Sequence, residues 1–432
     1  MSTTPRPPLF RLVFAVLFLF GCVSVALAQH EGGVTGGGTI GGSTSRPPSK
    51  PPANKPSPTT STPKKKPPVT TSTNKPGATS TGATVNPKPS GTSPGTSTSG
   101  PSTRPNTGTT GTSSSSADYY YQQGEALYNA KKYREALDPY LRAAQLNPSM
   151  SSAFYRMGWI YNDFEEYQSA IDPLQRAISL VPNYAAAHFE LGYAYKKLDR
   201  FDDALVSFRQ CVSAKPDYAV AHYEIGWIQN DQKHYNDAIR SLQSALQYRA
   251  NYPEAFNEMG YALRYLGRHQ EAIFQYQQAI RLKPELGLAH LGLGDVYYYN
   301  TKNYEEAAKA YKEGLRLRPD NVTALYNLGW CYNDLERYTD AIAELRKAIS
   351  LRPNYAEAYN EMGYALHQLS RYAEAVVAYQ SAIRNKSDYA SAHYNLGMSY
   401  VALRNRNGAL EQYRILQRID GGRATKLFNQ IK

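Results

Sequence analysis

Glycine recurs at an almost constant spacing along the C-terminal part of this 432-residue chain. The spacing is 34 residues five times, then 35, then 34 twice. The nine glycines are Gly124, Gly158, Gly192, Gly226, Gly260, Gly294, Gly329, Gly363 and Gly397. An alanine follows each of them by twelve residues, except in the sixth unit, where one extra residue precedes Ala307. A period of this length indicates a supersecondary unit that is stable only when neighbouring units stack on it.

Each unit is predicted to be a helical hairpin. Helical periodicity runs on both sides of a short polar break such as Asp199-Arg200. The glycine and the alanine remove bulk where the two helices cross, and a proline near the end of most units stops the second helix. The extra residue of the sixth unit is expected in the turn between its helices, at 300–303. Pro139 and Pro173 fall inside second helices, where we expect a local kink.

This pattern resembles the tetratricopeptide repeat (TPR) family. In the seventh unit the family's large, small and breaker residues are Leu325, Leu328, Gly329, Tyr332, Ala341, Leu345, Ala348 and Pro353. Nine units are assigned within 117–423, and residues 424–432 are expected to form a C-terminal capping helix. The units are 117–150, 151–184, 185–218, 219–252, 253–286, 287–321, 322–355, 356–389 and 390–423. The resemblance implies an all-α fold, a right-handed α-solenoid whose first helices line a concave groove, and a non-catalytic scaffold that binds proteins or peptides.

The first 28 residues are predicted to be a signal peptide. Two arginines precede an apolar stretch, and a small-x-small site places cleavage between Ala28 and Gln29. Two alternatives stay open: lipidation of Cys22, which would give a lipid anchor, and an uncleaved signal anchor. We therefore expect an exported protein of a bacterial cell, which is secreted, periplasmic or associated with the envelope.

Residues 29–116 are predicted to be a disordered linker. The segment has no Phe, Tyr or Trp, and it holds 15 of the 27 prolines and 14 of the 31 glycines. It also carries a net charge of +8, whereas residues 117–432 carry only +2 of the chain's +12. The linker is interpreted as a solvated spacer, and the alternative is that its lysines bind an anionic envelope polymer. In that alternative the protein is a structural envelope tether whose repeats oligomerise.

Position 9 of the units carries aromatic residues that we call the aromatic ladder. A 68-residue module, in which a unit with Trp, Asn and Asp precedes a unit with Gly-Tyr-Ala, occurs three times, with the sixth unit interposed before the last copy. The ladder is Trp159, Tyr193, Trp227, Tyr261, Trp330 and Tyr364, flanked by Asn162, Asp163, Asn230, Asp231, Asn333 and Asp334. These residues either bind a ligand in the groove or pack between adjacent units. Acids at position 6, such as Glu190, would favour a basic ligand if they border the groove, and the chain's own residues 46–89 are one candidate.

No residue pattern in the sequence indicates catalysis. The histidines lack metal-ligand spacing, and there is no phosphate-binding glycine loop, nucleophile elbow or HExxH sequence. We therefore expect no cofactor, no metal and no nucleic-acid partner. Cys211 and Cys331 are 120 residues apart and are expected to be small apolar fillers rather than a disulfide.

Overall fold

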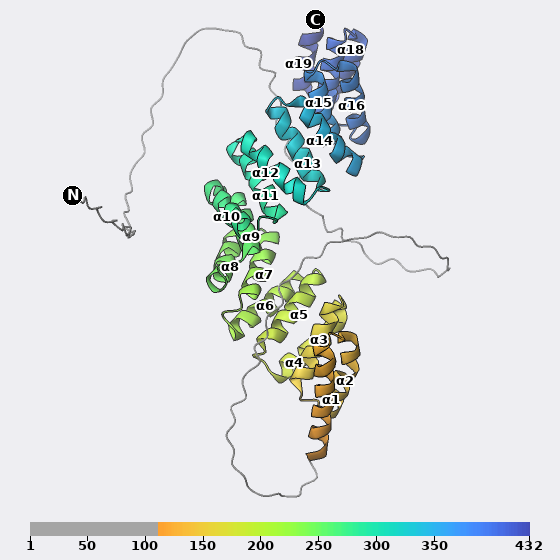
Figure 1. Ribbon diagram of the computed structural model, residues 1–432. Helices are drawn as coiled ribbons and strands as arrows, with labels where there is room; N and C mark the ends of the chain where they lie inside the picture. The colour runs from red at the N-terminus through yellow and green to blue at the C-terminus, as the bar shows by residue number, and fades with distance from the viewer. Residues whose placement is uncertain (1–110) are drawn as a thin grey trace, which may run out of the picture. The chain divides into compact units, whose positions relative to one another are not determined.

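The computed structural model describes residues 111–432, with side chains from residue 116, and its regular structure there is entirely helical. The predicted signal peptide 1–28, its cleavage site, Cys22 and residues 29–110 of the linker lie outside the described residues. Figure 1 shows helices α1 to α19 following one another in antiparallel pairs. The all-α fold and the helical hairpins predicted from the sequence are confirmed for this part of the chain.

Each unit contributes one first helix and one second helix. The first helices are α1 (Gly111–Asn129), α3 (Ser151–Asp163), α5 (Ala185–Lys197), α7 (Ala219–Asp231), α9 (Pro253–Tyr265), α11 (Gly287–Asp295), α13 (Val322–Asp334), α15 (Ala356–Gln368) and α17 (Ala390–Ala402). The second helices are α2 (Tyr133–Leu146), α4 (Tyr167–Leu180), α6 (Phe201–Ala214), α8 (Tyr235–Tyr248), α10 (His269–Leu282), α12 (Tyr304–Leu317), α14 (Tyr338–Leu351), α16 (Tyr372–Asn385) and α18 (Arg406–Ile419). A π-helix, η1 (Val296–Thr301), follows α11, and α19 (Gly421–Ile431) ends the chain.

Stacking joins the units in chain order. Each first helix packs on its own second helix, and each second helix packs on the first helix of the next unit. Neighbouring first helices also touch directly, as α3 touches α5 and α7 touches α9. Each unit therefore buries its apolar side mainly against its nearest neighbours, as expected for a repeat array.

The repeated glycines lie where the paired helices approach most closely. A Cβ atom added at Gly158 would lie 2.4 Å from Cγ of Leu174, and one added at Gly329 would lie 2.5 Å from Cγ of Leu345. The partner alanines, such as Ala170, are fully buried. The crossing predicted from the glycine and alanine positions is confirmed.

The turn between the two helices of a unit contains one residue with a left-handed backbone. This residue is glycine only in the fifth unit, at Gly267 with φ 76°. Elsewhere it is Lys131, Glu165, Asp199, Lys233, Lys302, Glu336, Ser370 or Arg404. The left-handed residue ends the first helix and reverses the chain, and it is strained for a side chain with a Cβ atom.

The extra residue of the sixth unit lies inside its first helix, so the prediction that it lengthens the turn at 300–303 was wrong. After α11 the helix widens into η1, which accommodates one inserted residue. Lys302 and Asn303 then take the left-handed and N-cap positions that the other units also have. Since the turn keeps its usual geometry, the helix absorbs the insertion.

Both ends of the repeat array differ from the predicted boundaries. Helix α1 begins at Gly111, six residues before the predicted start at 117, because a helix nucleated by the packed residues after Ala117 extends through the preceding serines. Helix α19 begins at Gly421 rather than 424, since the carboxylate of Asp420 caps it by accepting from the Arg423 N–H. Leu427, which belongs to this helix, is fully buried, as expected for a cap. Helices α2 and α4 continue through Pro139 and Pro173, and the expected kink stays a prediction.

Candidate protein-binding site

The aromatic ladder lies at the junctions between units. Trp159 packs on Tyr133 with ring centroids 5.3 Å apart, and Trp227 packs on Phe201 at 6.0 Å. In both cases the partner is the first residue of the second helix of the preceding unit. The same relation, at 6.1 to 6.3 Å, joins Tyr193 to Tyr167, Tyr261 to Tyr235 and Tyr364 to Tyr338.

Trp330 also contacts the π-helix η1 of the preceding unit. It packs on Tyr298 at 5.3 Å and on Tyr299 at 6.0 Å, and only 7% of its surface is exposed. The other five ladder residues are half-buried. The ladder therefore packs units together and still leaves part of most rings at the surface.

The three asparagines of the predicted site are buried and join adjacent first helices. Asn162 Nδ2 donates to the backbone carbonyl and to Oε2 of Glu190, both at 2.9 Å. Asn230 makes the same pair of bonds to Glu258 at 2.9 and 3.1 Å, and Asn333 to Glu361 at 3.1 and 3.3 Å. We call these three contacts the Asn–Glu joints. Since each amide already holds the next unit, these side chains do not point freely into a groove.

The position-6 glutamates are held between adjacent units rather than facing an open groove. Glu190, Glu258 and Glu361 belong to the Asn–Glu joints, and Glu224 pairs with Lys196. Glu190, Glu224 and Glu361 are each at least 92% buried, and Glu258 is half-buried. Burial raises the pKa of Glu190 to about 7, partly opposed by the Asn162 hydrogen bond. Burial also raises the pKa of Glu258, and hydrogen bonds from Asn230 and Asn257 oppose it. The expectation that these acids favour a basic ligand required them to border the groove, and this requirement is therefore not met.

The three aspartates that follow the asparagines remain nearer to solvent. Asp163 and Asp231 are exposed at the C-terminal ends of α3 and α7. Asp334 is half-buried and accepts a hydrogen bond from the Tyr298 hydroxyl. A ligand could therefore reach these carboxylates and the exposed parts of the ladder rings, among the predicted site residues.

A second set of joints uses the same helix position but was not found from the sequence. Lys196 lies 2.6 Å from Glu224 and places its Nζ 3.9 Å from the centre of the Trp227 ring. Arg264 lies 2.6 Å from Asp295. His367 Nδ1 lies 2.9 Å from Ser399 Oγ. The sequence does contain one indication of these contacts, because position 12 alternates between Asn and a basic residue along the modules.

Acidic residues replace the aromatic residue at position 9 in the first and sixth units. Glu125 accepts from the Tyr140 hydroxyl at 2.7 Å and from Arg156 at 2.7 and 3.0 Å. The Arg156 guanidinium and the Tyr140 hydroxyl lower the pKa of Glu125 against the effect of burial, which acts in the opposite direction. Asp295 likewise accepts from Tyr311 at 2.7 Å and from Asn327 at 3.2 Å. Both carboxylates are thus fixed within the stack.

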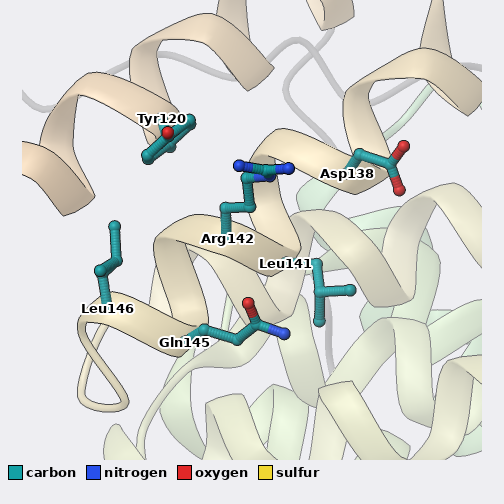
Figure 2. Close-up of a pocket in the computed structure, with 6 residues that line it drawn as sticks. All are labelled: Tyr120, Asp138, Leu141, Arg142, Gln145 and Leu146. Atoms are coloured by element: carbon teal, nitrogen blue, oxygen red, sulfur yellow. The ribbon is translucent and has the colours of Figure 1, made fainter.

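Figure 2 shows a surface pocket on the first unit, and no residue of the aromatic ladder is among those that line it. It is lined by Tyr120 of α1 and by Asp138, Leu141, Arg142, Gln145 and Leu146 of α2. Leu141 and Leu146 are more than 40% exposed there. Helices α1 and α2 form the first of the described units, whereas the last unit is covered by α19.

Family models match much of the repeat region. A TPR repeat model matches residues 158–199, 260–300 and 363–403, and tetratricopeptide repeat models match 185–218, 291–358 and 344–377. The matched residues, 158–218 and 260–403, therefore carry the repeats of which TPR repeat proteins are built. Such proteins are generally non-catalytic scaffolds that bind protein or peptide partners.

Solved TPR structures are similar to this chain in fold. The C-terminal part of a TPR repeat-containing protein from Cytophaga hutchinsonii is 15% identical, with a TM-score of 0.46 over 56% of this chain and 99% of that one. Pseudomonas aeruginosa pilF is 20% identical, with a TM-score of 0.44 over 48% and 94%. YrrB, a TPR protein with an unusual peptide-binding site, is 22% identical, with a TM-score of 0.37 over 43% and 95%. No curated protein matches the sequence.

Two further observations concern the described residues only. None of the helices in 111–432 is both long and apolar enough to span a membrane. The same residues contain no group of three or more His, Cys, Asp or Glu side chains placed to hold a metal ion.

Proposed function

We propose that the repeats form a right-handed superhelix and that an extended protein segment binds along the concave side lined by the first helices. The general role of TPR proteins supports this proposal. The stacked first helices support it as well, because they place equivalent side chains in register along one side of the array. The protein acts as a scaffold, and binding is its whole activity.

The observation that carries the proposal is the repeated pairing of an exposed acid with a partly exposed ring. Asp163 lies four residues after Trp159, and Asp231 lies four residues after Trp227, so each pair shares one helix face. A partly exposed aromatic ring beside a carboxylate suits a ligand with alternating apolar and basic groups. The proposed partner is therefore an extended, basic protein segment.

The proposal includes export, with residues 1–28 as the signal and residues 29–110 as a tether. Its support is the order of charged, apolar and small residues in the sequence. Expressing the full chain in a bacterial host and sequencing the mature N-terminus tests this part. A mature chain that begins at Gln29 supports it, and a chain in the cytoplasm that still begins at Met1 contradicts it.

Charge reversal at the exposed acids tests the binding proposal. The full chain with Asp163→Lys and Asp231→Lys together should capture its partner about tenfold more weakly in crosslinking pull-downs, since two favourable charge contacts become unfavourable. Asp172→Lys, an exposed acid on the second helix α4, is the matched control and should leave capture unchanged. Equal capture by the double variant and the control would refute binding along the first helices.

Deletion of the tether separates this function from the alternative of an envelope polymer tether. Removing residues 29–110 leaves α1 whole. Protein binding along the first helices should survive the deletion. Binding to an anionic polymer through the lysines should disappear with the deletion and should weaken steeply with salt in the intact chain.

A further inference from the structure

The Asn–Glu joints leave one buried polar atom in each asparagine without a partner. Nδ2 of Asn162 and of Asn230 must be the donor, because each faces a backbone carbonyl oxygen, which can only accept. The amide orientation is therefore set, and Oδ1 is the remaining atom. This Oδ1 is buried and accepts no hydrogen bond within the described residues, and the same holds for Asn333. A buried acceptor without a donor is unfavourable, so its recurrence in three equivalent joints needs an explanation.

The glutamate adjoins the amide that carries this orphaned oxygen. Oε2 of Glu190 lies 2.9 Å from Asn162 Nδ2, so the carboxyl group adjoins the same amide. An ionised carboxylate has no donor to offer, whereas a neutral carboxylic acid has one O–H. A neutral acid and a primary amide can each donate to the other and accept from the other.

We infer that the Asn–Glu joints hold a proton: Glu190, and to a lesser extent Glu258, join the units as neutral carboxylic acids that donate to the asparagine Oδ1. Ionisation of the glutamate then removes the donor, leaves a buried charge beside a buried carbonyl oxygen, and loosens the joint. The array thus loses stability as the pH rises. This inference concerns the folding of the repeats and holds whether or not the proposed ligand exists.

The groups that face Glu190 support a neutral acid. Among the described residues, no cation interacts with it, and the one charged group that does is Asp163, whose negative charge also opposes ionisation. The titratable groups around it from the four packed helices and turns are Asp163 and Tyr155 of α3, Tyr193 of α5, Cys211 of α6 and Tyr218 before α7. Burial raises the pKa of Cys211 to about 12 and raises the pKa of each of these tyrosines, so none of these four groups ionises in the range where Glu190 does.

Glu258 has a more mixed environment, which sets the expected order of the joints. Lys196 lowers its pKa and Glu224 raises it, while Asn257 gives its Oε1 a second donor at 3.2 Å. The titratable groups that face it are Lys196 of α5, Glu224 and Tyr223 of α7, Tyr261 of α9 and Tyr276 of α10. A nearby cation and a second hydrogen bond both favour the ionised form. Glu190 should therefore give the larger pH effect.

The direction of the pH dependence follows from linkage. The pKa of Glu190 is about 7 in the folded chain and 4.5 in the unfolded chain. Between these two values the folded state binds the proton and the unfolded state does not, so stability falls as the pH rises through this window and then levels off. The folding equilibrium should change on the order of a hundredfold across the window because of this one group.

The test compares the full chain with Glu190→Gln by urea unfolding at a series of pH values from 4.5 to 8. Glutamine keeps the shape and carries a permanent N–H donor for Asn162 Oδ1. The variant should equal the wild type near the low end, be more stable at the high end, and lack the wild-type slope in between. A variant that is less stable at every pH, with the slope unchanged, would mean that Glu190 is ionised and that a water fills the joint, and this would overturn the inference.

Two further measurements keep the test decisive. Glu224→Gln is the matched control, because this residue has the same position in its unit but pairs with Lys196, so its loss should lower stability without removing the Glu190 slope. Infrared spectroscopy of the folded wild type at pH 6 should show a protonated carboxyl band that is weaker in Glu190→Gln. The same band intensity in both proteins would also overturn the inference, whatever the stability of the variant.

Discussion

The joints within a 68-residue module and the joints that link a module to the unit after it use the same helix position with different chemistry. Within a module, Asn162, Asn230 and Asn333 hold a glutamate of the next unit by an uncharged amide. At the end of a module, Lys196 and Arg264 hold an acid of the following unit by charge, and His367 holds Ser399. The repeat thus keeps one geometry and varies the type of contact. The within-module joints should respond to protons, and the charged joints should respond to salt and to the loss of either partner.

The largest effect is expected at the joint between the fifth and sixth units. Arg264→Leu should lower the free energy of unfolding by about 2–3 kcal/mol, because Asp295 is left half-buried without its cation. Urea unfolding followed by circular dichroism measures the change. Arg264→Lys keeps the charge and should recover about half of the loss. A loss below about 1 kcal/mol would show that Tyr311 and Asn327 suffice to hold the acid.

A smaller effect is expected within a module. Asn162→Ala should cost about 1–2 kcal/mol at pH 7, because the backbone carbonyl and the carboxyl group of Glu190 lose a buried donor. Combining it with Glu190→Gln gives a double-mutant cycle, and the two changes should be strongly non-additive. Additive effects would show that the two side chains do not act as a pair.

The fold was predictable because its evidence is periodic. Nine glycines and nine alanines in register indicate a helix crossing in each unit, and Gly158 and Leu174 lie at such a crossing. The insertion in the sixth unit carried no such evidence. Residues 296–303 suit a longer turn or a widened helix equally well, and only the packing of Tyr298 against Trp330 distinguishes them.

The candidate site was less predictable, because its contacts cross from one unit to the next. The ladder positions were visible in the sequence, but their partners, such as Tyr133 for Trp159, lie at the start of a different helix. The pairing of Asn162 with Glu190 spans 28 residues and depends on how two units stack. A one-dimensional pattern shows which residues recur, and it does not show which of them meet.

Salt separates the two kinds of joint with a modest effect. Lys196→Met should cost about 1 kcal/mol at low salt, since it removes the Glu224 ion pair and the contact with the Trp227 ring. The cost should shrink in 1 M NaCl, because salt screens the ion pair in the wild type. Asn230→Ala is the uncharged control, and its cost should be the same at both salt concentrations. An equal salt response of the two variants would remove the distinction between the joints.

The joint between the eighth and ninth units should give the smallest effect and the opposite pH dependence. Burial lowers the pKa of His367 from 6.5, and Ser399 Oγ donates to the Asn395 carbonyl, so the ring donates its Nδ1–H to Ser399 as a neutral imidazole. Below about pH 6.5 His367 binds a proton more readily in the unfolded chain than in the folded chain. Stability is therefore lost as the pH falls. His367→Gln should remove this acid-side loss and should leave the loss between pH 4.5 and 7 from Glu190 in place. Because the two slopes oppose each other, each is resolved only as the difference between a variant and the wild type at the same pH. If His367→Gln unfolded with the wild-type pH profile, this joint would be a plain hydrogen bond without linkage to protons, and only the Asn–Glu joints would carry the pH response.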